Sequence, residues 1–213
     1  MSENNRKGVL LVVSGFSGAG KGTVMKRLLE KYDSYALSIS MTTRAPRQGE
    51  ENGREYFFVD METFEQKIKE KKVIEYARYC DNYYGTPREY VEEQLGKGKD
   101  VILEIELQGA LQVKELFPDS VLLFIMPPSA AELYHRLVSR GTETEEVIRK
   151  RMRRAVEEAQ DIEKYDYIVI NDDLDTCVMH LHEIVESVHE EARRNRETID
   201  RIRKELQELL KGE

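Results

Sequence analysis

Short apolar runs alternate with amphipathic segments along most of this chain. The runs that predict buried strands cover residues 9–13, 35–40, 100–107, 120–126 and 165–171. Helical spacing of apolar residues follows Lys21 and Pro87, and recurs over 108–116, over 129–140, from a capping box at Thr142–Glu145 to about 164, and from Leu174 to the end. Strands that alternate with helices predict an α/β fold with a doubly wound parallel sheet.

Residues 41–90 interrupt this alternation. They begin with the turn-rich, charged stretch TTRAPRQGEENGRE and continue with a predicted strand over 55–60, a helix over 60–71, and strand and turn over 73–85. Because this segment has strands of its own and many of the chain's tyrosines, we expect a small inserted subdomain of mixed α+β structure. We expect a single domain, 1–213, into which this subdomain is inserted. The core of the domain would comprise residues 8–40 and 91–190.

The last predicted helix continues into an extension, residues 191–213, with charges on most of its faces. A thin apolar stripe runs along the helix and comprises Leu181, Ile184, Val188, Ala192, Ile199, Ile202, Leu206 and Leu209. The stripe is too short to predict a coiled coil. Three arrangements stay open: packing on its own domain, pairing with a second subunit as a homo-oligomer, and projection into solvent.

Composition narrows the class of protein. The formal net charge of -8 argues against general binding to nucleic acid or to an anionic membrane. Cys80 and Cys177 are too few and too far apart for a disulfide framework or a zinc site. The polar start MSENNRKG and the lack of a long apolar run favour a cytoplasmic protein. The histidines have no ligand spacing and are expected at the surface; they are His135, His180, His182 and His189.

The stretch GFSGAGKGT, residues 15–23, follows an apolar run and precedes a predicted helix. It matches G-x-x-x-x-G-K, in which backbone N–H groups and the lysine bind the phosphates of a nucleotide. The residues expected around the phosphates are Gly15, Ser17, Gly18, Ala19, Gly20, Lys21, Gly22 and Thr23. Gly22 stands where a Ser or Thr usually ligates Mg²⁺, so Thr23 or ordered waters would have to hold the ion.

A second anion site is indicated within the insertion. Arg44 and Arg47 lie three residues apart, and Tyr56 follows a glycine-rich turn. Two guanidinium groups and a phenol suit a dianionic phosphate. On spacing alone, pairing of the arginines with Glu50, Glu51 and Glu55 is an equal alternative.

The stretch SMTTRAPRQGEENGREYFF resembles the substrate motif of guanylate kinases, S-x-T-T-R-x-x-R-x-G-E-x-x-G-x-x-Y. The stretches VIEYA, NYYGT, EIELQG, RGTETEE and IVINDD extend the resemblance to about residues 8–190. It implies a P-loop kinase core with an inserted GMP-binding subdomain and a helical lid at about 129–164. It also implies transfer of the γ-phosphoryl group of ATP to GMP, and to dGMP, with Mg²⁺ as cofactor.

The resemblance also implies roles for single residues. Arg44, Arg47, Tyr56 and Tyr84 would bind the GMP phosphate, Ser40 and Thr86 would face the guanine O6, and Glu75 and Glu106 would accept from N1–H and the 2-amino group. The lid and core arginines that close on the transferred phosphate would be Arg136, Arg140 and Arg151, with Asn171 near the donor adenine.

Two of these positions carry an argument from the pattern as well. Glu104-Ile105-Glu106 stands where the family often has Asp-x-Asp, and alternation predicts that both glutamates share one face at a strand end. Glu104 is also a candidate for the Mg²⁺ water shell. Arg151 shares the apolar stripe of its helix with Ile148 and Ala155, so it should face inward toward an anion or pair with a glutamate.

Two alternative functions remain beside that of a guanylate kinase. Guanylate-kinase-like domains also serve as non-catalytic interaction modules, typically with damaged phosphate loops, whereas Lys21 and its loop are intact here. The other alternative is a P-loop kinase for a different nucleoside monophosphate or a sugar phosphate. A sugar phosphate would offer nothing for Ser40, Glu75, Thr86 and Glu106 to read.

Overall fold

The computed structural model describes residues 6–79, 81–139, 141 and 144–211. Its main sheet has five strands in the order β2-β7-β1-β8-β9, and every pairing is parallel. The strands are β1 (Leu10–Gly15), β2 (Tyr35–Leu37), β7 (Asp100–Glu104), β8 (Val121–Met126) and β9 (Tyr167–Ile170). The predicted α/β fold with a parallel sheet is therefore confirmed.

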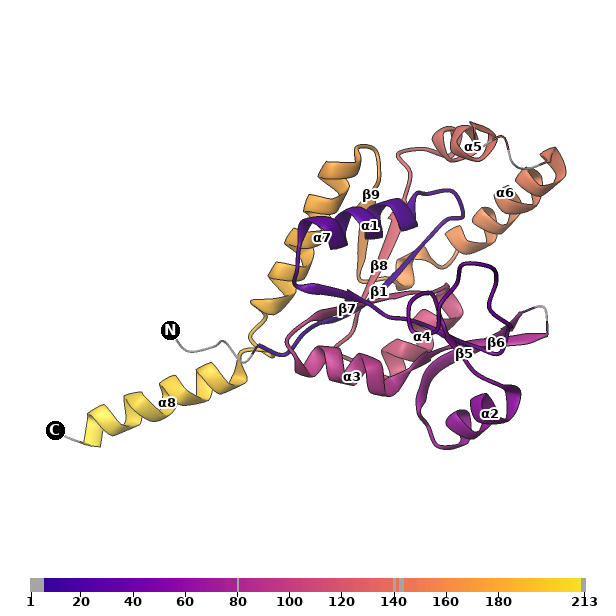
Figure 1. The fold of residues 1–213 in the computed structure, drawn as a ribbon. Helices are drawn as coiled ribbons and strands as arrows, with labels where there is room; N and C mark the ends of the chain where they lie inside the picture. The colour runs from indigo at the N-terminus through magenta and orange to yellow at the C-terminus, as the bar shows by residue number, and fades with distance from the viewer. Residues whose placement is uncertain (1–5, 80, 140, 142–143, 212–213) are drawn as a thin grey trace.

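Helices cover both faces of this sheet. Figure 1 shows α1 (Lys21–Lys31) and α7 (Leu174–His189) on one side, and α3 (Arg88–Gly96) and α4 (Leu107–Leu116) on the other. The central strands read as continuous apolar runs because both of their faces are buried. Val12, Ile102 and Leu122 are 0% exposed. This core holds the ends of β1 and β7 in place, and the candidate site lies at those ends.

The segment after β2 forms a second, four-stranded sheet in the order β4-β3-β6-β5. Its elements are β3 (Met41–Thr42), β4 (Phe57–Phe58), α2 (Met61–Lys69), β5 (Val73–Tyr79) and β6 (Asn82–Pro87). Met41, Phe64 and Val73 form a separate small core, and the Phe64 ring stacks on Tyr83 with centroids 5.1 Å apart. The expected strand over 35–40 is thus wrong at its end: β2 stops at Leu37, and Met41 begins the second sheet.

The chain between β8 and β9 forms an arm of two helices. It comprises α5 (Ala130–Ser139) and α6 (Glu145–Ala159), and the 3₁₀ turn Ile162–Lys164 returns the chain to β9. The expected capping box is wrong in position. Thr142 lies outside the described residues, and the N-cap of α6 is Thr144, whose hydroxyl accepts from the Val147 N–H at 3.4 Å.

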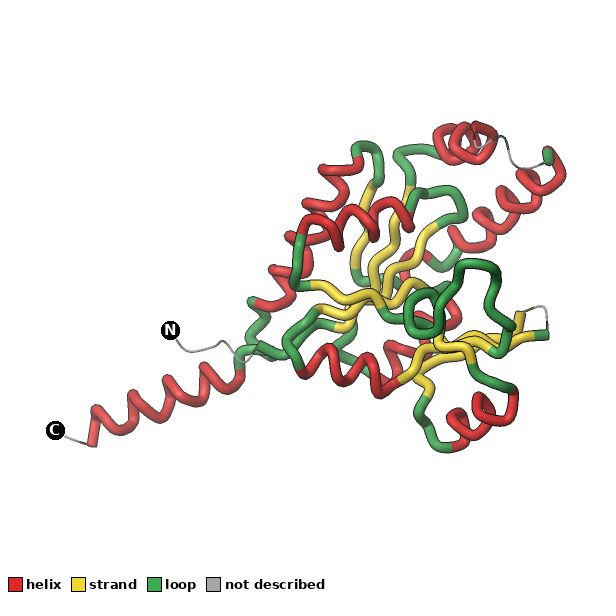
Figure 2. The backbone as a smooth tube through the Cα atoms, in the orientation of Figure 1, coloured by secondary structure: helices red, strands yellow, loops and turns green. Residues whose placement is uncertain are grey.

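The C-terminal helix predicted from Leu174 onward is interrupted. α7 ends at His189, and α8 (Arg196–Lys211) follows after a short irregular segment and extends away from the body in Figure 2. The Asn195 side chain explains the break, because its Nδ2 donates to the carbonyls of His189 and Glu191 at 2.8 and 3.0 Å. The bond to His189 satisfies a carbonyl at the helix end that has no partner within the helix.

Of the histidines expected at the surface, His189 is buried and His182 is half-buried. His189 is 7% exposed, and its Nε2 lies 2.8 Å from Oδ1 of the buried Asp100. His182 stacks on Tyr32 with ring centroids 3.8 Å apart. His135 and His180 are exposed, as expected. Within the described part of the chain, no helix combines the length and the apolar character that crossing a membrane requires.

Candidate functional site

The phosphate-binding motif forms a tight turn between β1 and α1. Gly18 and Gly20 have φ angles of 98° and 91°, a region that side chains disfavour. A Cβ on Gly20 would also lie 2.5 Å from the Asn171 side chain. The Lys21 Nζ donates to the Gly15 carbonyl at 3.1 Å, across the turn. The first turn of α1 has no acidic residue, so the positive end of the helix dipole faces the loop without a neutralising charge.

Gly22 differs from the other glycines of this motif. A Cβ at this position would meet nothing within 4 Å, and its φ is not positive. Neither space nor backbone conformation therefore requires a glycine here. Thr23 is exposed on the first turn of α1. Its hydroxyl and the Glu104 carboxylate are oxygen ligands of the kind that Mg²⁺ prefers, so these residues are chemically suited to the ion.

Three predicted donor-side residues converge on the loop. The buried Asn171 donates its amide to the Ala19 carbonyl at 2.8 Å. Arg151, on α6, donates from Nη1 to the Ser17 hydroxyl at 2.7 Å. Arg136, on α5, pairs with Glu132 at 2.7 Å, and its Nη1 lies 3.4 Å from the Ala19 carbonyl. Arg140, the other predicted arginine, lies outside the described residues.

The two arginines of the insertion differ in their surroundings: Arg44 is ion-paired, and Arg47 is exposed. Arg44 makes a bidentate ion pair with Glu50, in which both N–O distances are 3.0 Å. Its guanidinium lies 5.4 Å from the centre of the Tyr56 ring. This side-chain pair, together with the Arg47 N–H, lowers the pKa of Glu50. Arg47 has an exposed side chain. Arg44 thus pairs with a glutamate, as the alternative expects, and its binding of a phosphate stays a prediction.

A buried carboxylate lies at the centre of the insertion. Glu75, on β5, is 8% exposed, and its Oε1 accepts from the Thr86 hydroxyl at 2.7 Å. Burial raises the pKa of Glu75, which the bonds from Thr86 offset in part. A Cβ on Gly109, in α4, would lie 3.1 Å from its Oε2. The absence of a side chain at Gly109 leaves this oxygen its space.

Two adjoining cavities connect these groups. One, of about 470 Å³, is lined by residues of the loop, including Lys21 and Ser17. The other, of about 190 Å³, is lined by Ser40 and Thr86. Tyr56, Glu104 and Ile105 line both cavities. The phosphate loop and the polar groups of the insertion therefore face a common space.

The expectation that Glu104 and Glu106 share a strand face is wrong. β7 ends at Glu104, and Glu106 is the N-cap residue of α4. Its side chain is 80% exposed, and its Oε2 accepts from Arg154 Nη2 at 2.8 Å. The alternation of a strand does not apply because the chain turns into a helix immediately after Glu104.

Among the residues that line the loop cavity and that sequence reasoning missed are Arg154, Glu158 and Tyr165. Arg154 joins Glu106 to Glu158, which accepts from its Nε at 2.9 Å. The second oxygen of Glu158 and the Tyr165 hydroxyl are buried, and no described residue bonds them. The available signal was the four-residue spacing of Arg154 and Glu158 on one helical face.

Comparisons with known proteins agree with this geometry. The sequence model of the guanylate kinase family matches residues 7–188. A guanylate kinase of Oceanobacillus iheyensis is 52% identical over 183 residues, covering 86% of this chain and 89% of the relative. One from Caldanaerobacter subterraneus is 49% identical over 200 residues, covering 94% and 97%. The solved guanylate kinase of Anaplasma phagocytophilum aligns with a TM-score of 0.68 at 34% identity, covering 89% and 90%. This chain therefore belongs to the guanylate kinase family.

Proposed function

We propose that the chain transfers the γ-phosphoryl group of ATP to GMP, and to dGMP, giving ADP and the corresponding diphosphate. The observation that carries this proposal is the shared wall of the two cavities, Tyr56, Glu104 and Ile105. This shared wall supports a donor-phosphate loop and a base-reading pocket on either side of one reaction space. Membership of the guanylate kinase family supports the same assignment.

Glu75 is the group that selects guanine in this proposal. Guanine offers adjacent donors, N1–H and the 2-amino group, whereas adenine has an acceptor at N1. A buried carboxylate facing an acceptor would lose its hydrogen bonds, which costs on the order of 1–3 kcal/mol or more for a charged group. Thr86 already supplies one donor to Glu75 and is itself 1% exposed. Glu106 would contribute a second carboxylate once it leaves Arg154.

The acceptor phosphate would meet Arg44, Arg47, Tyr56 and Tyr84. Arg44 has more N–H donors than Glu50 can occupy, so the ion pair orients the guanidinium and leaves donors for the phosphate. The Tyr56 and Tyr84 rings pack edge to face, with centroids 6.0 Å apart. This packing positions the two phenols beside the guanidinium.

The transfer step needs no general base, because the attacking phosphate oxygen of GMP is already ionised at neutral pH. It needs alignment and positive charge around the moving group. Lys21, the loop N–H groups, Arg136, Arg140 and Arg151 would supply that charge. Mg²⁺, held by Thr23 and Glu104 directly or through water, would neutralise charge on the donor phosphates. Closure of the arm and the insertion would exclude water and so suppress ATP hydrolysis.

The test is an assay of ADP release with ATP and Mg²⁺ across GMP, dGMP, AMP, UMP, CMP and ribose phosphates. We expect activity confined to the guanine nucleotides, and its loss in Lys21→Met. Tight GMP binding without ADP release would instead identify a non-catalytic interaction module. Activity on a sugar phosphate would contradict the base-reading role of Glu75.

A further inference from the structure

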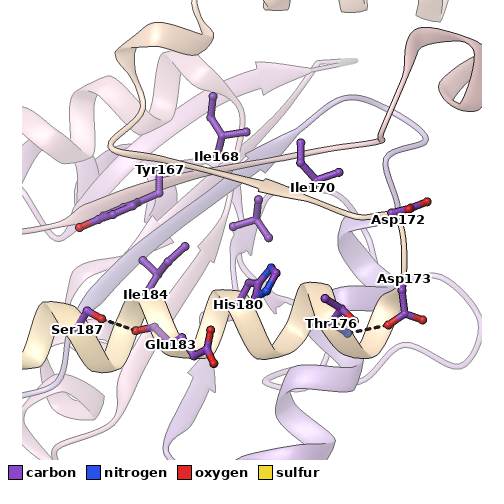
Figure 3. A pocket seen from close by; sticks show the side chains of 11 residues that line it. Tyr167, Ile168, Ile170, Asp172, Asp173, Thr176, His180, Glu183, Ile184 and Ser187 are labelled. Carbon is purple, nitrogen blue, oxygen red and sulfur yellow. Dashed lines mark hydrogen bonds between the residues drawn. The ribbon is translucent and has the colours of Figure 1, made fainter.

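A groove runs along the outer edge of the main sheet, and the end of it that holds Ile170 and Asp172 adjoins Asn171 beside the phosphate loop. It has a volume of about 740 Å³ and lies between β9 and α7 (Figure 3). One wall is the strand, whose Tyr167 is 37% exposed; Ile168 and Ile170, 49% and 45% exposed, point to the side of β9 that is turned away from α7 (Figure 3). Within the described residues, β9 pairs with β8 and with no strand on its other side. An apolar strand edge of this kind is usually covered in native proteins.

The other wall of the groove follows one face of α7. It comprises Thr176, His180, Glu183, Ile184 and Ser187, which recur at helical spacing over almost the whole helix. The lining of the groove therefore follows α7 over almost its whole length. Helices that lie in such grooves present an apolar stripe at spacings of three and four residues.

α8 has a stripe of that kind and nothing on which to bury it. Ile199, Ile202, Leu206 and Leu209 follow a three-four-three spacing, and α8 has no buried residue. Ile202, Leu206 and Leu209 are 42%, 56% and 72% exposed. At about 1.5 Å per residue, the 16 residues of α8 span about 24 Å, the same length as the 16 residues of α7.

The segment between α7 and α8 directs α8 away from the groove of its own chain. Arg194 donates from Nη2 to the Asp119 carbonyl at 2.7 Å, and its side chain is 15% exposed. Asn195 is bonded to the end of α7 at 2.8 and 3.0 Å. These contacts fix the start of α8, and Figure 2 shows the helix leading outward from the body.

We propose that α8 of a second copy of this chain lies in the α7–β9 groove, and that the exchange is reciprocal across a two-fold axis. Charge favours this occupant. The ionisable residues that line the groove are Tyr167, Asp172, Asp173, His180 and Glu183, with no Lys or Arg among them. On α8, Arg196 and Arg203 flank one side of the apolar stripe, and Glu205 flanks the other. The Arg203 pair with Asp200, at 3.0 Å, is 71% and 69% exposed, so it can be exchanged at little cost.

The expected strength follows from the size of the contact. A helix about 24 Å long and about 10 Å wide, docked twice, buries on the order of 1,000 Å² in total. That is near the lower limit for a specific protein–protein interface. Interfaces at this end of the size range are typically weak, so the dimer should dissociate on dilution. Its formation is independent of the proposed kinase function, since neither α8 nor the groove residues were assigned to that site.

The first experiment measures the molar mass of the full chain against concentration by light scattering and sedimentation. We expect a monomer–dimer equilibrium that Leu206→Glu with Leu209→Glu shifts to monomer by at least tenfold in Kd. Lys204→Glu with Glu208→Lys, on the opposite face of α8, is the matched control and should leave the dimer intact. Thermal unfolding checks that both variants fold. A monomeric wild type at high concentration overturns the proposal.

The second experiment tests which surfaces meet. In a Cys80→Ser background, a chain with Leu206→Cys is mixed with a tagged chain carrying His180→Cys. His180 lies near the middle of α7 and Leu206 near the middle of α8, so the two can meet whichever way α8 runs along the groove. We expect a disulfide-linked dimer containing one chain of each kind, absent when Lys204→Cys replaces Leu206→Cys. Predominant links between two Leu206→Cys chains would indicate paired α8 helices instead. A third chain carries both His180→Cys and Leu206→Cys. An intrachain disulfide in this chain would indicate that α8 folds back onto its own groove. Either result overturns the proposal.

Discussion

Gly22, the second residue of helix α1, lacks a side chain although space for one is present. Gly22→Ser is predicted to lower the Mg²⁺ concentration for half-maximal rate severalfold, because its hydroxyl would join the oxygen ligands of the ion. It should also stabilise the protein by about 0.5 kcal/mol, since glycine is a poorer helix former than serine. Gly22→Ala gives the helical gain without the hydroxyl. If both variants have the same Mg²⁺ dependence, the ligand role is excluded.

The buried carboxylate of Glu75 is predicted to lower stability at neutral pH. Burial raises the pKa of Glu75, so the folded protein holds this proton more tightly than the unfolded chain. Its contribution is favourable below the ordinary pKa of a glutamate and is lost as the pH rises through the raised pKa. Each tenfold difference in proton affinity between the folded and unfolded states corresponds to about 1.4 kcal/mol. Glu75→Gln should therefore raise Tm at pH 7 and change it little at pH 4.

The same substitution should damage the function. Glutamine places an acceptor and a donor where the proposal needs two acceptors, so kcat/KM for GMP should fall by about 10- to 100-fold, equivalent to about 1–3 kcal/mol. The KM for ATP should change little. Gains in Tm at pH 7 with unchanged kcat/KM for GMP would contradict the base-reading role of Glu75.

At the scale of elements, α6 spans the donor and acceptor sides. Arg151 donates to Ser17 of the phosphate loop, and Arg154, one turn further along, donates to Glu106 at the start of α4. Arg154→Gln is predicted to release Glu106 for GMP and to lower the KM for GMP by up to about fivefold. The limit is set by exposure, because exposed ion pairs contribute at most about 1 kcal/mol.

Arg153→Gln is the matched control, since Arg153 is exposed on the same helix. The difference between Arg154→Gln and the wild type should shrink as salt screens the ion pair. A rise in the KM for GMP in Arg154→Gln would mean that Arg154 itself supports binding.

Elements were predictable where local pattern determines them. β1 and β8 are buried on both faces, so continuous apolar runs identified them. The strand expected over 100–107 overran because Leu107 is apolar for a different reason: it begins α4 and packs on the core from there. Burial of His189 depends on Asp100, 89 residues away. No local pattern carries that information.

The candidate site divides in the same way. The phosphate loop was predictable because its glycines and lysine are contiguous in the sequence. Arg154 was not, because its partner Glu106 is 48 residues distant and the two meet only when α6 packs over the end of the sheet. Pairing of Arg44 with Glu50 lay between these cases, six residues apart across a turn whose geometry the sequence leaves open.

At the scale of the whole molecule, the arm and the insertion flank the two cavities and are predicted to approach each other when both nucleotides bind. Spin or dye labels at Glu62→Cys on α2 and Glu146→Cys on α6, both exposed positions, would report the distance between them. In a Cys80→Ser background, GMP with a non-hydrolysable ATP analogue should shorten it more than either ligand alone. An unchanged distance would mean that the arm and the insertion do not close, so that water would have to be excluded by a rigid site.

Arg6 lies far from the phosphate loop, at the end of the sheet where the chain also leaves α7. It pairs with Glu186 at 2.8 Å and lies 3.9 Å from the buried Asp100. Figure 1 shows the described chain entering β1 and leaving toward α8 on this side. Tethering through the N-terminal side would therefore orient an immobilised protein with its nucleotide entrance toward the solution. Attachment through α8 would share that orientation but would occupy the stripe offered to a second copy.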